Sequence, residues 1–126
     1  MATLWGPVLV VEDEPVLLDN LEKFLRQHNI IALKARSAEA ALHILKGVRV
    51  HVIVCDNGLE LANGGLKLLD IVHQWYPETR RIIMTCALTD EVSAFAYTRN
   101  IPAIQKGERN SHTRLVEHIK KELGVG

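Results

Sequence analysis

Residues 8–14 read Val-Leu-Val-Val-Glu-Asp-Glu, an uninterrupted apolar run that ends in three acids. Such a run is typical of a strand covered on both faces, as the strands of a parallel sheet are. The pattern returns in residues 52–56, Val-Ile-Val-Cys-Asp, and in residues 82–85, Ile-Ile-Met-Thr. The chain is therefore expected to fold around buried parallel strands that carry polar residues at their carboxyl ends.

Outward from these runs, short apolar segments alternate with amphipathic ones. The segments predicted as strands are Val8–Val11, Ile30–Ala35, Val50–Cys55, Arg81–Thr85 and Ala103–Gln105. Apolar residues at helical spacing follow each strand, and these helices are expected to begin at Pro15, after Ser37, after the Asn63-Gly64-Gly65 turn, after Thr89 or Asp90, and at Ser111, the last ending at Gly124. This alternation predicts an α/β fold, a five-stranded parallel sheet with five helices on both faces, in a single domain over residues 1–126.

The composition argues against several classes of function. The chain has 126 residues, 48% of them hydrophobic, which is enough to bury one core. Its fifteen basic and fifteen acidic side chains cancel, so the excess of Lys and Arg that a nucleic-acid surface needs is missing. No apolar run approaches the roughly 18 residues that span a bilayer, and residues 1–11 lack the basic start of a signal peptide. The protein is therefore predicted to be cytoplasmic, with reduced thiols and no direct contact with nucleic acid or membrane.

Polar residues stand at the ends of four predicted strands. Glu12 and Asp13 follow the first strand, Asp56 follows the third, Thr85 ends the fourth and Lys106 follows the fifth. Ligands in such sheets bind beyond the carboxyl ends of the strands, where these residues can converge. Three neighbouring carboxylates need a cation or protons, and Mg²⁺ suits hard oxygen ligands. With an ammonium group and a hydroxyl donor beside them, the set predicts phosphoryl-transfer chemistry.

At these residues the chain resembles the receiver domains of two-component response regulators, and it is similar to the chemotaxis response regulator. Four segments carry the resemblance in the same order along the chain: residues 8–14 with the acidic pair, 52–56 with the phosphoacceptor, 82–87 with the hydroxyl and 103–106 with the lysine. The resemblance implies the flavodoxin-like receiver fold with strand order 2-1-3-4-5.

A metal site is part of what the resemblance implies. Asp13 and Asp56 would bind Mg²⁺ or Mn²⁺ directly, Glu12 would bind it through a water, and the backbone carbonyl of Gly58 would complete the protein ligands.

The resemblance also implies the phosphoryl chemistry. Asp56 would take a phosphoryl group from a sensor histidine kinase or a phosphotransfer protein, Lys106 would pair with that group, and Thr85 would turn toward it. Such a protein catalyses its own phosphorylation and dephosphorylation rather than the turnover of a separate substrate. The face formed by the fourth helix, fifth strand and fifth helix would meet an output domain, a partner protein or a second copy of the chain.

The chain departs from the family pattern at two positions near the lysine. Gly107 stands where the family has a proline in a cis bond, and a cis bond before a residue other than proline costs about 3 kcal/mol. A trans bond between Lys106 and Gly107, with a rerouted loop, is therefore predicted. Ala103 stands in place of the family's switch aromatic, which predicts a muted or different conformational response on the output face.

Two other functions compete with phosphotransfer. The departures at Ala103 and Gly107 would suit a receiver-like module that works only by protein contact. A phosphatase of the dehalogenase-like type also uses an aspartate at a strand end, but it needs a second acid two positions later, where this chain has Gly58.

Two pairs of residues near these segments have alternative interpretations. Cys55 and Cys86 flank the predicted site and could form a redox switch, but buried apolar roles are favoured for both. Trp75 and Tyr76 are predicted to cap the core or to lie at a helix end, with a binding surface as the alternative.

Overall fold

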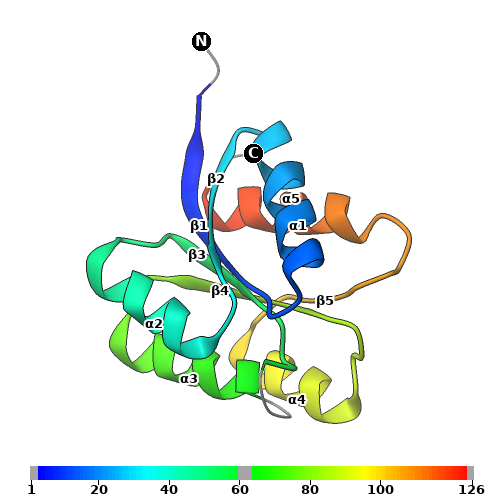
Figure 1. The fold of residues 1–126 in the computed structure, drawn as a ribbon. Helices are drawn as coiled ribbons and strands as arrows, with labels where there is room; N and C mark the ends of the chain where they lie inside the picture. Colours follow the sequence, from blue (N-terminus) through cyan, green and yellow to red (C-terminus); the bar gives the residue numbers. More distant parts are fainter. Residues whose placement is uncertain (1–2, 60–63, 125–126) are drawn as a thin grey trace.

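A five-stranded parallel sheet organises the chain in the computed structural model, which describes residues 3–59 and 64–124 (Figure 1). The strands are β1 (Trp5–Val11), β2 (Ile30–Ala35), β3 (Val52–Cys55), β4 (Arg80–Thr85) and β5 (Ala103–Gln105). The helices are α1 (Pro15–Gln27), α2 (Ala38–Gly47), α3 (Gly64–Trp75), α4 (Asp90–Arg99) and α5 (Ser111–Glu122). The sheet order is β2-β1-β3-β4-β5, which confirms the predicted fold and strand order.

The starts of β1 and β3 differ from the predicted bounds. β1 begins at Trp5, ahead of the predicted Val8, because Trp5 pairs with Ile30 and its N–H donates to Asn29 O at 2.8 Å. β3 begins at Val52 rather than Val50, because the backbone bends at His51. The carboxyl ends, which carry the polar residues, fall where the sequence places them.

Local capping explains where the helices start. In α1, Pro15 occupies the first turn, and the Glu14 carboxylate accepts hydrogen bonds from the N–H groups of Val16 and Leu17. α4 begins after Thr89, whose hydroxyl accepts from the Val92 N–H. Within the described residues, no helix combines the length and the apolar character that a membrane span requires.

Two helix boundaries differ from the sequence prediction. α3 begins at Gly64, so the two glycines predicted for a turn belong to the helix itself, while Asn63 of that turn lies outside the described residues. α5 ends at Glu122, before the predicted Gly124, whose positive φ of 76° ends the helical path.

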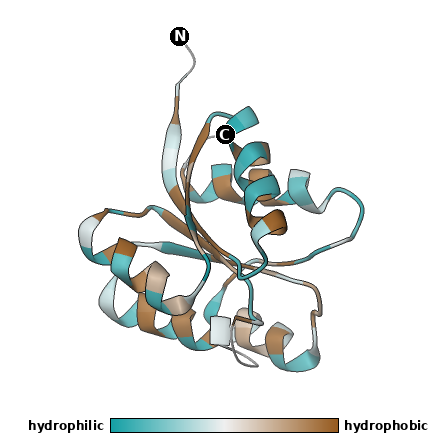
Figure 2. Cartoon of the chain, in the orientation of Figure 1, coloured by the Kyte–Doolittle hydropathy of each residue, from teal (hydrophilic) through white to brown (hydrophobic). Residues whose placement is uncertain are grey.

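Helices cover both faces of the sheet, with α1 and α5 on one side and α2, α3 and α4 on the other (Figure 1). Alternate β1 residues enter the two cores: Leu9 and Val11 pack with α2, α3 and α4, while Val8 and Val10 pack with α1 and α5. Figure 2 shows apolar residues running along the strands and the inner sides of the helices. This double cover leaves the rim of the sheet as the place for polar side chains.

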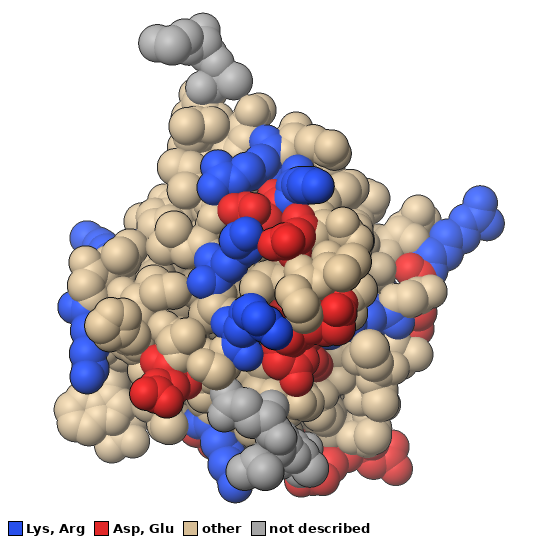
Figure 3. Space-filling view, in the orientation of Figure 1, with Lys and Arg blue, Asp and Glu red and all other residues tan. Residues whose placement is uncertain are grey.

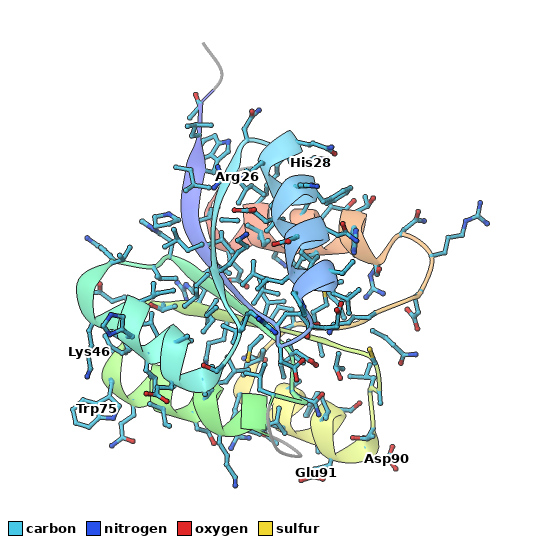
Figure 4. All side chains as sticks on the ribbon, viewed as in Figure 1. Arg26, His28, Lys46, Trp75, Asp90 and Glu91 are labelled. Atoms are coloured by element: carbon cyan, nitrogen blue, oxygen red, sulfur yellow. The ribbon has the colours of Figure 1, made fainter. Side chains whose placement is uncertain are left out.

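Trp75 and Tyr76 have different surroundings at the end of α3. Trp75 is the last residue of α3, as predicted for a helix end, and it is 69% exposed. It lines a groove between α2 and α3 together with Lys46, and both are labelled in Figure 4. Tyr76 packs against the core cluster on the side of α2, α3 and α4, so only the tyrosine covers the core.

Candidate functional site

The register of the parallel strands brings their polar ends to one rim. Val11 pairs with Cys55, so Glu12 and Asp56 follow side by side on adjacent strands. The Asp56 N–H donates to Val11 O at 3.1 Å. On the far side of β4, the Lys106 N–H donates to Thr85 O at 2.7 Å, which holds the lysine at the same rim. Backbone pairing alone therefore places four of the predicted residues at one rim of the sheet.

Three carboxylates gather at this rim. A carboxylate oxygen from each of Glu12, Asp13 and Asp56 lies within 4.8 Å of the others. Glu12 is only 2% exposed, Asp56 is half-buried and Asp13 is exposed, so the cluster runs from the interior to solvent. Acidic side chains gather near the centre of the face shown in Figure 3, with basic side chains beside them.

Lys106 lies between two of the acids. Its Nζ contacts Glu12 Oε1 and lies 3.4 Å from Asp56 Oδ2, and its side chain is 13% exposed. Burial disfavours the ammonium, but the hydrogen bond to Glu12 and the charges of Asp56 and Glu12 outweigh it, so the pKa of Lys106 is raised. Burial also raises the pKa of Glu12, and Lys106 opposes that rise. Lys106 therefore stays charged and compensates part of the negative charge of the rim.

The Thr85 hydroxyl has a partner that no sequence motif indicates. Thr85 Oγ1 donates to Asn57 Oδ1 at 2.5 Å, and it accepts from the Ala87 N–H at 3.3 Å. Thr85 is 1% exposed. An Asn directly after Asp56 is visible in the sequence, but nothing in a local pattern links it to a residue 28 positions later.

The segment after Asp56 is held by the start of α3. The Gly58 N–H donates to Asp56 Oδ1 at 3.3 Å, and the Gly65 N–H donates to Asn57 O at 3.0 Å. Gly65 is buried so closely that a Cβ there would lie 1.9 Å from Asp56 O. The sequence predicts only a turn at the double glycine, whereas its second member is the packing partner of the Asp56 backbone.

The two cysteines have opposite environments. Cys55 is buried beside the site, and burial, with the charges of Asp56 and Glu12, raises the pKa of its thiol well above the ordinary value. It fits the predicted role of a small buried apolar residue. Cys86 is exposed, so that prediction was wrong for Cys86, because the chain turns outward directly after β4.

Comparison with known protein families agrees with this geometry and identifies the family. The sequence profile of the response regulator receiver domain matches residues 8–107. The chain belongs to the response regulator receiver family. It is a receiver domain of the kind found in two-component systems. Among curated proteins, no significant sequence match is found.

Solved structures share the fold at low sequence identity. A CheY-like receiver domain protein from Methanospirillum hungatei JF-1 is 22% identical, with a TM-score of 0.84 over 98% of this chain and 95% of that one. The receiver domain of response regulator 1452 from Francisella is 18% identical, with a TM-score of 0.83 over 95% and 98%. NtrX from Brucella abortus is 23% identical, with a TM-score of 0.82 over 96% of this chain but 26% of its own length.

The two departures of this receiver domain have visible structural consequences. The bond between Lys106 and Gly107 is trans, as predicted, since the one cis bond of the described residues joins Gly6 and Pro7. Gly107 takes a positive φ of 81°, so the glycine turns the chain after β5. Lys106 nevertheless reaches both carboxylates. Ala103 packs against the core cluster on the side of α2, α3 and α4, with a methyl group where the family has its aromatic ring.

Proposed function

We propose that this receiver domain accepts a phosphoryl group on Asp56, with a divalent metal ion bound beside it. The observation that carries the proposal is the placement of Lys106, whose ammonium lies 3.4 Å from Asp56 Oδ2 although the family's proline is missing. A module that worked only by protein contact would have no need for a lysine directed at this carboxylate, with side chains that are only 13% and 14% exposed.

In the proposed reaction, an Asp56 carboxylate oxygen attacks the phosphorus of a phosphohistidine. A new P–O bond forms, the P–N bond breaks, and the donor imidazole leaves with the electron pair and takes up a proton. Lys106 provides positive charge where the phosphoryl oxygens would lie, and the Gly58 N–H orients the attacking carboxylate through its bond to Oδ1. The residues position the reactants and offset charge, which is the main requirement of phosphoryl transfer.

The donor set fits Mg²⁺ or Mn²⁺. Asp13 and Asp56 offer carboxylate oxygens, and the exposure of Asp13 leaves room for an ion that keeps waters. Glu12 Oε1 contacts Lys106 and Glu12 Oε2 accepts from the Glu14 N–H at 3.2 Å, so contact through a water suits Glu12 better than direct ligation. The Gly58 carbonyl is the proposed third direct protein ligand, after Asp13 and Asp56. When bound, the ion supplies charge that neutralises the acids and the phosphoryl oxygens.

The proposal is tested by incubating the protein with acetyl phosphate and Mg²⁺ and measuring its intact mass. We expect a gain of one phosphoryl group that hydroxylamine removes, and no gain in Asp56→Asn, which keeps the size of the side chain but loses the nucleophile. Unmodified parent protein under conditions that phosphorylate another receiver would favour the protein-contact module instead.

Replacing Asp13 with asparagine should stabilise the protein in the absence of divalent ions. The change removes one of three clustered negative charges, and relief of this partly solvated repulsion is expected to raise the free energy of unfolding by about 1 kcal/mol. Millimolar Mg²⁺ should stabilise the parent and have little effect on Asp13→Asn, because a ligand bound only by the folded state raises its stability. Thermal melts with and without EDTA measure both effects. Equal Mg²⁺ stabilisation of the two proteins would place the ion elsewhere.

The proposed donor is a sensor histidine kinase or a phosphotransfer protein in the cytoplasm. We further propose that residues 1–126 act as one receiver domain and that the face of α4, β5 and α5 contacts the output domain, a partner protein or a second copy. NtrX shows a receiver-like region within a longer chain, since this chain covers 26% of its length. Because Ala103 lacks an aromatic ring, the conformational response on this face is expected to be muted.

A further inference from the structure

The bond between Thr85 and Asn57 occupies the only proton that the threonine hydroxyl can donate. The hydroxyl accepts from the Ala87 N–H at 3.3 Å, and it donates to Asn57 Oδ1 at 2.5 Å. A second acceptor, Ala87 O, lies at 3.4 Å, a much longer contact. One O–H serves one good acceptor at a time, so a phosphoryl oxygen on Asp56 would have to compete with Asn57 for it.

Asn57 is held firmly enough to act as that competitor. It follows Asp56 directly, and its own carbonyl accepts from the Gly65 N–H at 3.0 Å, which ties it to the first turn of α3. Thr85 is buried at the end of β4, so its side chain has little freedom, and the backbone of Asn57 is fixed beside it. The carboxamide and the hydroxyl therefore meet because of the backbone, rather than through chance contact of two mobile side chains.

Because position 103 carries no aromatic ring, the hydrogen bond between Thr85 and Asn57 has a larger part in restraining the threonine. Ala103 on β5 is too small to fill or vacate a space as Thr85 moves, so no ring at this position can rotate with the threonine. We propose that Asn57 is a positioning residue that holds the Thr85 hydroxyl in the unphosphorylated state and releases it when Asp56 carries a phosphoryl group. This inference rests on the proposed function. It assigns the restraint on Thr85 to a hydrogen bond instead of a ring.

The test measures binding of beryllium fluoride, a phosphoryl mimic, in the presence of Mg²⁺. In Asn57→Leu, which is similar in size but has no acceptor, Thr85 no longer has to leave a partner. Affinity for the mimic should rise by roughly two- to tenfold, the range that one neutral hydrogen bond contributes. In a Thr85→Val background, the same Asn57→Leu change should have no effect, because the valine has no hydroxyl to hold.

A second readout does not depend on the mimic. The methyl resonance of Thr85 should report one rotamer in the parent and in Asn57→Asp, which keeps an oxygen acceptor, and averaged rotamers in Asn57→Leu. Unfolding curves identify a variant that fails to fold, in which case Asn57→Ala replaces it. Unchanged or weaker affinity in Asn57→Leu, or an equal gain in the Thr85→Val background, overturns the inference. Failure of the parent itself to bind the mimic overturns the proposed function instead.

Discussion

Replacing Lys106 with methionine is expected to lower the free energy of unfolding by about 3 kcal/mol at neutral pH, the low end for breaking a buried ion pair. The Lys106 side chain is 13% exposed and the Glu12 side chain 3%, so water can replace only part of the stabilisation that the ammonium provides. Methionine keeps the length and the apolar stem but leaves Glu12 and Asp56 facing each other without a cation. Urea unfolding of the two proteins measures the difference.

The same substitution should change how stability depends on pH. Because burial raises the pKa of Glu12 above its ordinary 4.5, the folded state binds that proton more tightly than the unfolded chain does, and ionisation costs stability. Without Lys106 the pKa of Glu12 rises further. The loss of stability in Lys106→Met should therefore be largest above the folded pKa that Glu12 has in the variant, and it should shrink as the pH falls below that value. In the parent, the raised pKa of Lys106 adds stability below its ordinary 10.5, which is lost as the pH rises through the folded value.

Lys34 provides a matched control for this prediction. Its ammonium also faces two carboxylates, Asp19 at 2.9 Å and Glu22 at 3.3 Å, but on the surface. Lys34→Met should change stability little. Phosphorylation by acetyl phosphate should fall about a hundredfold in Lys106→Met, because a preorganised charge is lost, and should be unchanged in Lys34→Met. Equal losses in the two variants would show that burial of the Lys106 pair has no special importance.

How far the sequence predicts this fold is clear from β1. The run Val8–Val11 is typical of a strand covered on both faces, and the structure places alternate residues in two separate cores. The start of β1 at Trp5 was not predictable in the same way, because it depends on pairing with Ile30, which a local pattern does not reveal. Strand order came from the family resemblance, since alternation of strands and helices alone allows several orders.

The candidate site, too, could be predicted from the sequence only in part. Convergence of Glu12, Asp56 and Lys106 follows from the parallel sheet, because the carboxyl ends of neighbouring strands share a rim. The bond from Thr85 to Asn57 does not follow, because it depends on how the loop after β3 lies over the end of β4. The tight packing of α3 on that loop could not be predicted either, because a pair of glycines in a sequence indicates only a turn.

Replacing Gly65 with alanine is expected to destabilise the protein by about 3 kcal/mol, the upper end for atoms forced into a packed region. The added Cβ would lie 1.9 Å from Asp56 O and 2.6 Å from the Cα of Asn57. Both neighbours are backbone, so neither can turn aside as a flexible side chain would. Calorimetric melting of the variant measures the loss.

The sign of this effect separates packing from helix propensity. Alanine in place of glycine normally favours a helix by up to about 1 kcal/mol, and at Gly47, the end of α2, an added methyl group would meet nothing within 4 Å. Gly47→Ala should thus be neutral or stabilising, while the same change at Gly65 is costly. Since the clash falls on the Asp56 backbone, Gly65→Ala should also displace the carboxylate and slow phosphorylation by about a hundredfold. If Gly65→Ala matched Gly47→Ala in both measurements, the start of α3 could not be what positions Asp56.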